Sequence, residues 1–181
     1  MTLELDVLKD VAGKLNKASI NYFISGSVAM SFYAQPRMTR DIDIVVVLTR
    51  RDVSQFVDLF KDEYYIDPDT VDEEVKRGGM FNVINNQSIV KIDFILKKES
   101  EFSEEQFKNV HPMDIEGIKI QVISPENLVL SKLLWAKDSL SETQLRDVRN
   151  IIENVKPLNI AHIERWVKKL GLVNIYSKVK K

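Results

Sequence analysis

The sequence predicts an α/β (or α+β) protein, in which a small mixed β-sheet is flanked by helices and followed by a helical C-terminal segment. Two observations predict this class. Up to residue 123, short β-branched apolar runs alternate with segments of helical periodicity. From Pro125 onward the pattern is helical only. We therefore expect an α/β core over residues 1–123, with a helical segment over residues 124–181 packed on it.

The elements expected in the core follow from periodicity and turn residues. The run at 42–48 is almost continuously β-branched, as in a strand buried on both faces. The turn at 85–87 is expected to join two strands as a hairpin. Expected helices are 3–18, 28–34, 51–61 and a short one from Pro68; expected strands are 22–25, 42–48, 80–84, 89–96 and 118–123. Residues 99–108 are expected to form a loop with one helical turn.

The helical segment begins where Ser124 can cap a helix whose first position is Pro125. Expected helices are 126–137, 142–155 and 159–170, with one more short helix in the last ten residues. Trp135 and Trp166 are expected to pack in the core. Arg146 and Asp147 are expected on a solvated helix face.

Composition excludes several classes of function. The net charge of −1 gives no strong field for nucleic acid or an anionic membrane. The absence of cysteine excludes disulfides, thiolate metal sites and cysteine nucleophiles. The two histidines, His111 and His162, support neither a Ser-His-Asp triad nor a zinc site. No apolar stretch reaches membrane-spanning length, so we expect a cytoplasmic protein without membrane contact.

Two aspartates, Asp41 and Asp43, begin the most apolar strand. Residues at i and i+2 of a strand point to the same face, so this pair suits a hard divalent cation. Buried and unpaired charges are costly, so the two carboxylates need a counter-charge. A structural salt bridge to Arg37, Arg40 or Arg50 is the alternative to a metal.

A third carboxylate, Asp93, lies in the middle of the strand at 89–96. If that strand lies beside 42–48 in the right register, Asp93 joins the other two. Three carboxylates on adjacent strands can hold two Mg²⁺ ions about 4 Å apart, as in phosphoryl transfer. The alternative is that Asp93 faces solvent and pairs with Lys91 or Lys97.

Two further features point to phosphate. The turn Gly26-Ser27 begins with a glycine, which permits a close approach of the backbone. The serine can cap the following helix, whose N-terminus favours the binding of phosphate. Lys132 lies in a helix that is apolar on nearly every side and therefore needs an anionic partner, either a nucleotide phosphate or one of these three aspartates. Alternatively, its side chain reaches out to water.

Together these residues resemble the nucleotidyltransferase superfamily, which includes DNA polymerase beta and the aminoglycoside nucleotidyltransferases. Its signature is matched by Gly26-Ser27, by Asp41-Ile42-Asp43-Ile44 after a spacer, and by Asp93 as the third carboxylate. Within the superfamily the chain looks most like small bacterial nucleotidyltransferase-like proteins related to AbiE-type toxins. The segments that carry this likeness are Arg37-Met38-Thr39-Arg40-Asp41-Ile42-Asp43, Pro125-Glu126-Asn127-Leu128, Lys132 and Arg146-Asp147.

The resemblance implies a nucleotidyltransferase fold and Mg²⁺-dependent transfer of a nucleoside monophosphate from a nucleoside triphosphate to an acceptor hydroxyl. It implies that Asp41, Asp43 and Asp93 are catalytic and hold two Mg²⁺ ions, with Mn²⁺ as a substitute. The nucleotide would be bound by Gly26, Ser27, Arg37, Thr39, Arg40 and Lys132. The resemblance does not decide whether the acceptor is tRNA, a protein or a small molecule. It also does not decide whether there is an antitoxin-like protein partner.

Two other functions are compatible with the same residues. One is a regulatory protein that binds nucleotide or metal without transferring a group. Ser25 and the lack of a recognisable acceptor site are the observations that suggest it. The other is a metal-dependent phosphohydrolase that uses water as the acceptor.

Overall fold

The computed structural model describes residues 3–39, 41–139 and 141–180. The strands of this part form one mixed seven-stranded sheet in the order β3-β4-β5-β2-β1-β7-β6. They are β1 (Tyr22–Ile24), β2 (Asp41–Val46), β3 (Tyr64–Tyr65), β4 (Met80–Asn85), β5 (Lys91–Leu96), β6 (Val110–Ile115) and β7 (Ile118–Ile123). The central pairs β2/β5 and β1/β7 are parallel, and the other pairs are antiparallel. The predicted α/β class with a mixed sheet is confirmed.

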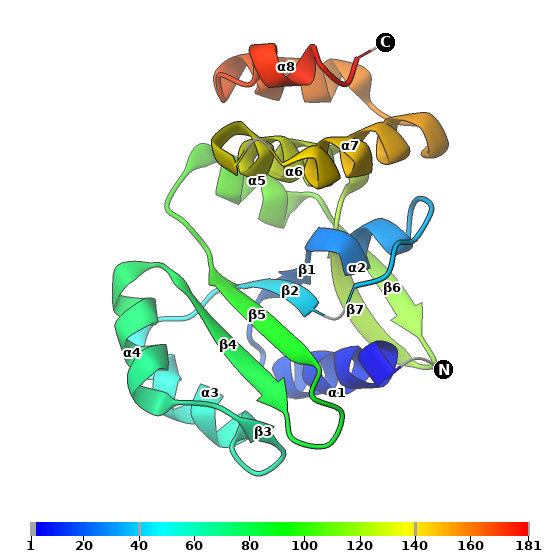
Figure 1. The fold of residues 1–181 in the computed structure, drawn as a ribbon. Helices are drawn as coiled ribbons and strands as arrows, with labels where there is room; N and C mark the ends of the chain where they lie inside the picture. The colour runs from blue at the N-terminus through cyan, green and yellow to red at the C-terminus, as the bar shows by residue number, and fades with distance from the viewer. Residues whose placement is uncertain (1–2, 40, 140, 181) are drawn as a thin grey trace.

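Helices flank this sheet and continue beyond it. They are α1 (Leu3–Lys17), α2 (Gly26–Ser31), the 3₁₀ turn η1 (Arg50–Asp52), α3 (Val53–Phe60), α4 (Pro68–Arg77), α5 (Glu101–Lys108), α6 (Pro125–Ser139), α7 (Glu142–Asn154), α8 (Ile160–Lys169) and α9 (Val173–Tyr176). Helices α6, α7 and α8 gather at one end of the molecule, away from α3 and α4 (Figure 1). None of the helices described is long and apolar enough to span a membrane.

The two faces of the central strands differ as strand alternation requires. Ile42, Ile44 and Val46 of β2 are fully buried, whereas the residues between them are only partly buried. On the buried side, aromatic rings of α3, β4 and β5 pack at centroid distances of 5.0–5.6 Å: Phe56, Phe60, Phe81 and Phe94. Packing on this side leaves the opposite face of β2 and β5 available for polar side chains.

Some sequence predictions need correction. Residues 101–108 form a complete helix, α5, because the Ser100 side chain caps it by accepting from the Ser103 N–H. Helix α2 begins at Gly26, so its N-cap position is Ser25 and the cap predicted at Ser27 is wrong. Trp166 is buried as expected, but the side chain of Trp135 is 60% exposed.

Candidate active site

The three predicted carboxylates share one face of the sheet. Strands β2 and β5 are parallel and in register, with Asp43 opposite Asp93 and Asp41 opposite Lys91. Neighbouring strands lie about 4.8 Å apart, so Asp43 and Asp93 are direct neighbours. Asp93 is only 8% exposed, and its Oδ1 atom is buried without a hydrogen-bond partner. The alternative that Asp93 faces solvent is therefore wrong.

Lys91 supplies a positive charge to this group. Its Nζ atom lies 3.1 Å from Asp93 Oδ2 and 3.5 Å from Asp41 Oδ2. Burial acts to lower the pKa of Lys91, but the hydrogen bond and charge of Asp93, with those of Asp41, raise it overall. The ion pair between Asp93 and Lys91, which the sequence left open, is thus present. Within the described residues, no three carboxylate or imidazole side chains converge as a ready-made metal site.

The Gly26 turn touches the carboxylate of Asp43. The Ser25 N–H donates to the carbonyl oxygen of Asp43 at 2.8 Å. Gly26 has φ +64°, and a Cβ atom there would lie 1.8 Å from Asp43 Oδ2. A Cβ at Gly26 would force the Asp43 carboxylate to move, so the predicted turn lies directly against one of the predicted carboxylates.

We expect Gly26→Ala to be far more harmful than the same change at Gly78. Both glycines have φ +64°, but a Cβ at Gly78 has nothing within 4 Å. Gly78→Ala should cost about 1 kcal/mol of unfolding free energy for the backbone alone. Gly26→Ala adds a collision with Asp43 and should lose clearly more. Urea titration of both variants measures the difference, and equal losses would contradict the close contact.

The environment of Asp43 disfavours its charge. Burial, followed by the charges of Asp93 and Asp41, raises the pKa of Asp43 from 3.8 to about 6, while Lys132 and Lys91 act in the opposite direction. A carboxylate with a raised pKa beside two others indicates a site that lacks positive charge. Such a site would gain from a bound cation.

This pKa predicts a pH effect that Asp43→Asn should remove. The folded chain keeps the Asp43 proton up to about pH 6, but the unfolded chain loses it near pH 3.8. Stability should therefore fall as the pH rises from about 4 to 6 and stay lower above it. In EDTA at pH 8, Asp43→Asn should be more stable than the wild type by on the order of 2–3 kcal/mol. Near pH 4, urea titration should find no gain; a destabilised variant at pH 8 would contradict the raised pKa.

Lys132 lies in a buried ion-pair network close enough to Asp43 for the two charges to interact. Its Nζ atom is 2.7 Å from Asp147 Oδ2 and donates to Gln144 Oε1 at 3.3 Å. The Arg37 Nε atom contacts both Asp147 oxygens, at 3.1 and 3.2 Å. The side chains of Lys132 and Asp147 are 4% and 3% exposed. Burial lowers the pKa of Lys132 despite the hydrogen bond and charge of Asp147.

The ion-pair partner of Lys132 is thus Asp147, which the sequence did not suggest, and the alternative in which Lys132 reaches water is wrong. The expectation that Asp147 lies on a solvated face is wrong too, although Arg146 is exposed. Asp147 lies four residues before the buried Ile151, on the apolar stripe of α7. That position is the sequence signal that could have identified it.

The other residues that the sequence suggested for this site form no hydrogen bond or ion pair with the three carboxylate groups in the part of the chain that the structure describes. The Thr39 hydroxyl donates to the carbonyl oxygen of Asp41 at 3.3 Å. Arg50 pairs with Asp72, so neither it nor Arg37 forms the salt bridge to Asp41 or Asp43 that was the alternative to a metal. Arg40 lies outside the described residues. Ser27 is buried beside Gly26.

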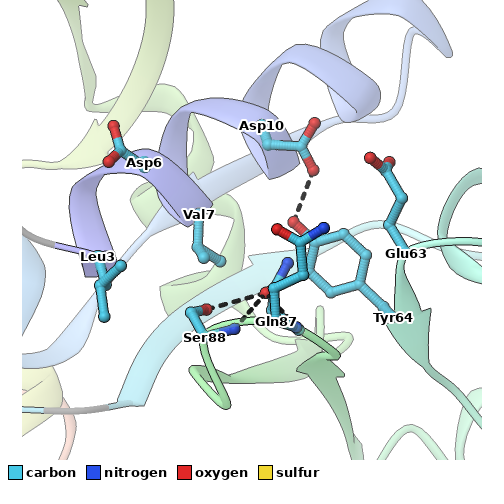
Figure 2. Close-up of a pocket in the computed structure, with 9 residues that line it drawn as sticks. Leu3, Asp6, Val7, Asp10, Glu63, Tyr64, Gln87 and Ser88 are labelled. Carbon is cyan, nitrogen blue, oxygen red and sulfur yellow. Dashed lines mark hydrogen bonds between the residues drawn. The ribbon is translucent and has the colours of Figure 1, made fainter.

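A second group of carboxylates borders a cavity of about 400 Å³ between α1 and the β4–β5 hairpin (Figure 2). These carboxylates already have partners. Asp10 accepts a hydrogen bond from the Tyr64 hydroxyl at 2.6 Å, Asp6 pairs with Lys9, and Glu63 pairs with Lys14. Because their charge is matched inside the protein, this cavity offers less to a cation than the face of Asp93.

The fold is that of nucleotidyltransferase-like proteins, as comparison with solved structures shows. A nucleotidyltransferase-like protein from Paracoccidioides brasiliensis is 20% identical, with a TM-score of 0.58 over 97% of this chain and 92% of that one. No protein-family model matches this chain, and no curated protein is similar to it in sequence.

Two antibiotic-modifying proteins share the fold as well. ANT(2″)-Ia, solved in complex with adenylyl-2″-tobramycin, is 12% identical, with a TM-score of 0.63 over 97% of this chain and 99% of that one. The lincosamide antibiotic adenylyltransferase LnuA, solved with lincomycin bound, is 16% identical, with a TM-score of 0.54 over 83% of this chain and 96% of that one. At these identities the likeness establishes the predicted nucleotidyltransferase fold.

Proposed function

We propose that this chain is a metal-dependent nucleotidyltransferase, which moves a nucleoside monophosphate from a nucleoside triphosphate to an acceptor hydroxyl. One observation carries the proposal: the register that sets Asp43 beside Asp93, with Asp41 on the same face and Gly26 against Asp43. Two proteins of the same fold support this chemistry: LnuA is an adenylyltransferase, and ANT(2″)-Ia was solved in complex with adenylyl-2″-tobramycin.

The residues of the site fit a divalent cation in kind. Asp41, Asp43 and Asp93 offer carboxylate oxygens, the ligands that Mg²⁺ and Mn²⁺ prefer. Asp93 Oδ1 is buried without a partner, and such an atom gains most from a ligand. We propose that these three aspartates hold the metal, with two Mg²⁺ ions as the full complement. Bound Mg²⁺ would supply a Lewis acid that acidifies the acceptor hydroxyl and neutralises phosphate charge.

The protein groups would then bind, orient and accept a proton. We propose that Asp93 receives the proton of the acceptor hydroxyl as the new phosphoester bond forms and the bond to pyrophosphate breaks. Gly26 lies against the carboxylate of Asp43, and we propose that the triphosphate is contacted by Gly26 and Ser27. Lys132 uses two of its three N–H donors on Gln144 and Asp147. We propose that the third donor, together with Arg37, stabilises charge on the departing pyrophosphate.

Calorimetry with Mg²⁺ and each nucleoside triphosphate, followed by a pyrophosphate-release assay, tests this function. We expect one triphosphate to bind and to release pyrophosphate when candidate acceptors are supplied. Binding without release would favour the regulatory protein. Release of free monophosphate only, with no adduct, would favour the phosphohydrolase.

The acceptor and any partner belong to the same proposal. Two of the similar structures hold adenylyl-2″-tobramycin and lincomycin, which favours a small-molecule acceptor. Hydroxyls of tRNA and of protein are the other candidates. The motif likeness to AbiE-type toxins suggests an antitoxin-like partner. Adenylate incorporation from labelled triphosphate into tRNA, protein and small-molecule fractions would distinguish the acceptors.

A further inference from the structure

Lys91 holds a position that the proposed metal site needs. It is the first residue of β5, two residues before Asp93, so both side chains point to the same face. The parallel register places it directly opposite Asp41. Its ammonium group lies within 3.1 Å of Asp93 Oδ2 and 3.5 Å of Asp41 Oδ2. One ammonium therefore bridges carboxylates of both strands.

We propose that Lys91 is a resident counter-ion that a divalent metal must displace, so that Lys91 sets the metal concentration at which the site assembles. This inference rests on the proposed metal-dependent function. A divalent cation and an ammonium repel each other strongly at separations of a few ångströms. A metal on the free Oδ1 of Asp93 would lie within a few ångströms of an ammonium on Oδ2 of the same carboxylate, so the two cations compete for Asp93.

The burial of the two partners shows which group would move. The side chain of Lys91 is 35% exposed, but that of Asp93 is only 11% exposed. A long, flexible lysine can turn into solvent at little cost. The carboxylate is held by its place in the middle of β5 between buried neighbours. Metal binding would thus release the ammonium and leave the strands where they are.

Lys91→Met tests this inference directly. It keeps the length of the side chain but removes its charge, so Mn²⁺ should bind more tightly in ordinary buffer, by roughly tenfold. Titration of the folded chain with Mn²⁺, read by the electron paramagnetic resonance of the unbound ion, measures the affinity without any turnover. Lys91→Arg keeps the charge and should bind Mn²⁺ nearly as weakly as the wild type.

Lys98→Met is the matched control. It removes the same charge from an exposed lysine that lies just beyond the other end of β5. Seven residues of extended chain place it about 20 Å from Lys91, well beyond the screening length in ordinary buffer. Its Mn²⁺ affinity should equal that of the wild type.

A second readout is thermal stability. In EDTA, Lys91→Met leaves the three carboxylates without their cation and should lower the melting temperature. Millimolar Mg²⁺ should raise the melting temperature of this variant more than that of the wild type. A variant that does not fold would reveal itself in the circular dichroism of the EDTA sample, in which case Lys91→Gln takes its place.

The possible outcomes separate the two proposals. Equal Mn²⁺ affinities for the wild type and Lys91→Met would overturn the role of Lys91 and leave the metal-dependent function standing. No Mn²⁺ binding by either protein, with or without a triphosphate, would overturn the metal site and the role of Lys91 together. Tighter binding by Lys98→Met as well would show a general charge effect and would also overturn the specific role of Lys91.

Discussion

Asp93→Asn is expected to lower pyrophosphate release by about a thousandfold or more, while nucleotide binding changes little. The substitution keeps the shape of the side chain but removes both a metal ligand and the proposed proton acceptor, each worth large factors in rate. The ion-pair partner of Asp93, Lys91, is 35% exposed and can turn into solvent, so the amide should not unfold the chain. Pyrophosphate release under saturating Mg²⁺ and triphosphate measures the loss.

Asp62→Asn is the matched control for this change. Asp62 is exposed and lies in the turn after α3, so its loss of charge should leave the rate unchanged. Calorimetry should find triphosphate binding by Asp93→Asn within a small factor of the wild type, since contacts of the turn and the basic residues remain. Retained turnover in Asp93→Asn would exclude the mechanism proposed for this site.

Asp147→Asn is expected to destabilise the fold by about 3–5 kcal/mol, the usual loss when one partner of a buried ion pair is removed. Lys132 would keep its charge in a site that is 4% exposed. The remaining contact to Gln144 is a neutral hydrogen bond. Urea denaturation at pH 7 measures the loss.

Two comparison variants show that burial causes this effect. The exposed pair between Lys61 and Asp58 has the same chemistry, so Asp58→Asn should cost less than about 1 kcal/mol. The double variant Lys132→Met with Asp147→Leu removes both buried charges and should regain most of the stability. A loss for Asp147→Asn no greater than that for Asp58→Asn would contradict a buried network.

The sequence predicted the parts of the site that depend on local rules. The strand period of two placed Asp41 and Asp43 on one face, and did the same for Lys91 and Asp93. A glycine after a strand and before a helix indicated a close backbone approach, and the structure has it against Asp43. The position of Asp93 beside Asp43 depends on how two strands about fifty residues apart pair with each other. Local sequence patterns do not determine that pairing or its register.

The parts that were missed depend on tertiary contacts. Asp147 is charged, so composition assigns it to the surface, but the packing of α7 on α6 brings it to Lys132. Strands β3 and β6 are edge strands without clear apolar alternation. Strand β3 has two residues, and β6 contains Pro112 and no buried side chain. Trp135 is exposed on a helix whose other apolar residues are largely buried, and no periodicity distinguishes it from them.

The central claim is that Asp41, Asp43 and Asp93 hold a divalent metal beside a bound triphosphate. A crystal grown with Mn²⁺ and a non-hydrolysable nucleoside triphosphate tests it most directly, through the anomalous scattering of manganese. We predict an anomalous peak within about 2.5 Å of oxygens of all three aspartates, with the triphosphate against the Gly26 turn and the Lys91 ammonium turned away from Asp93. A triphosphate bound elsewhere, or bound here with Lys91 still bridging Asp41 and Asp93 and no manganese between them, would contradict the account.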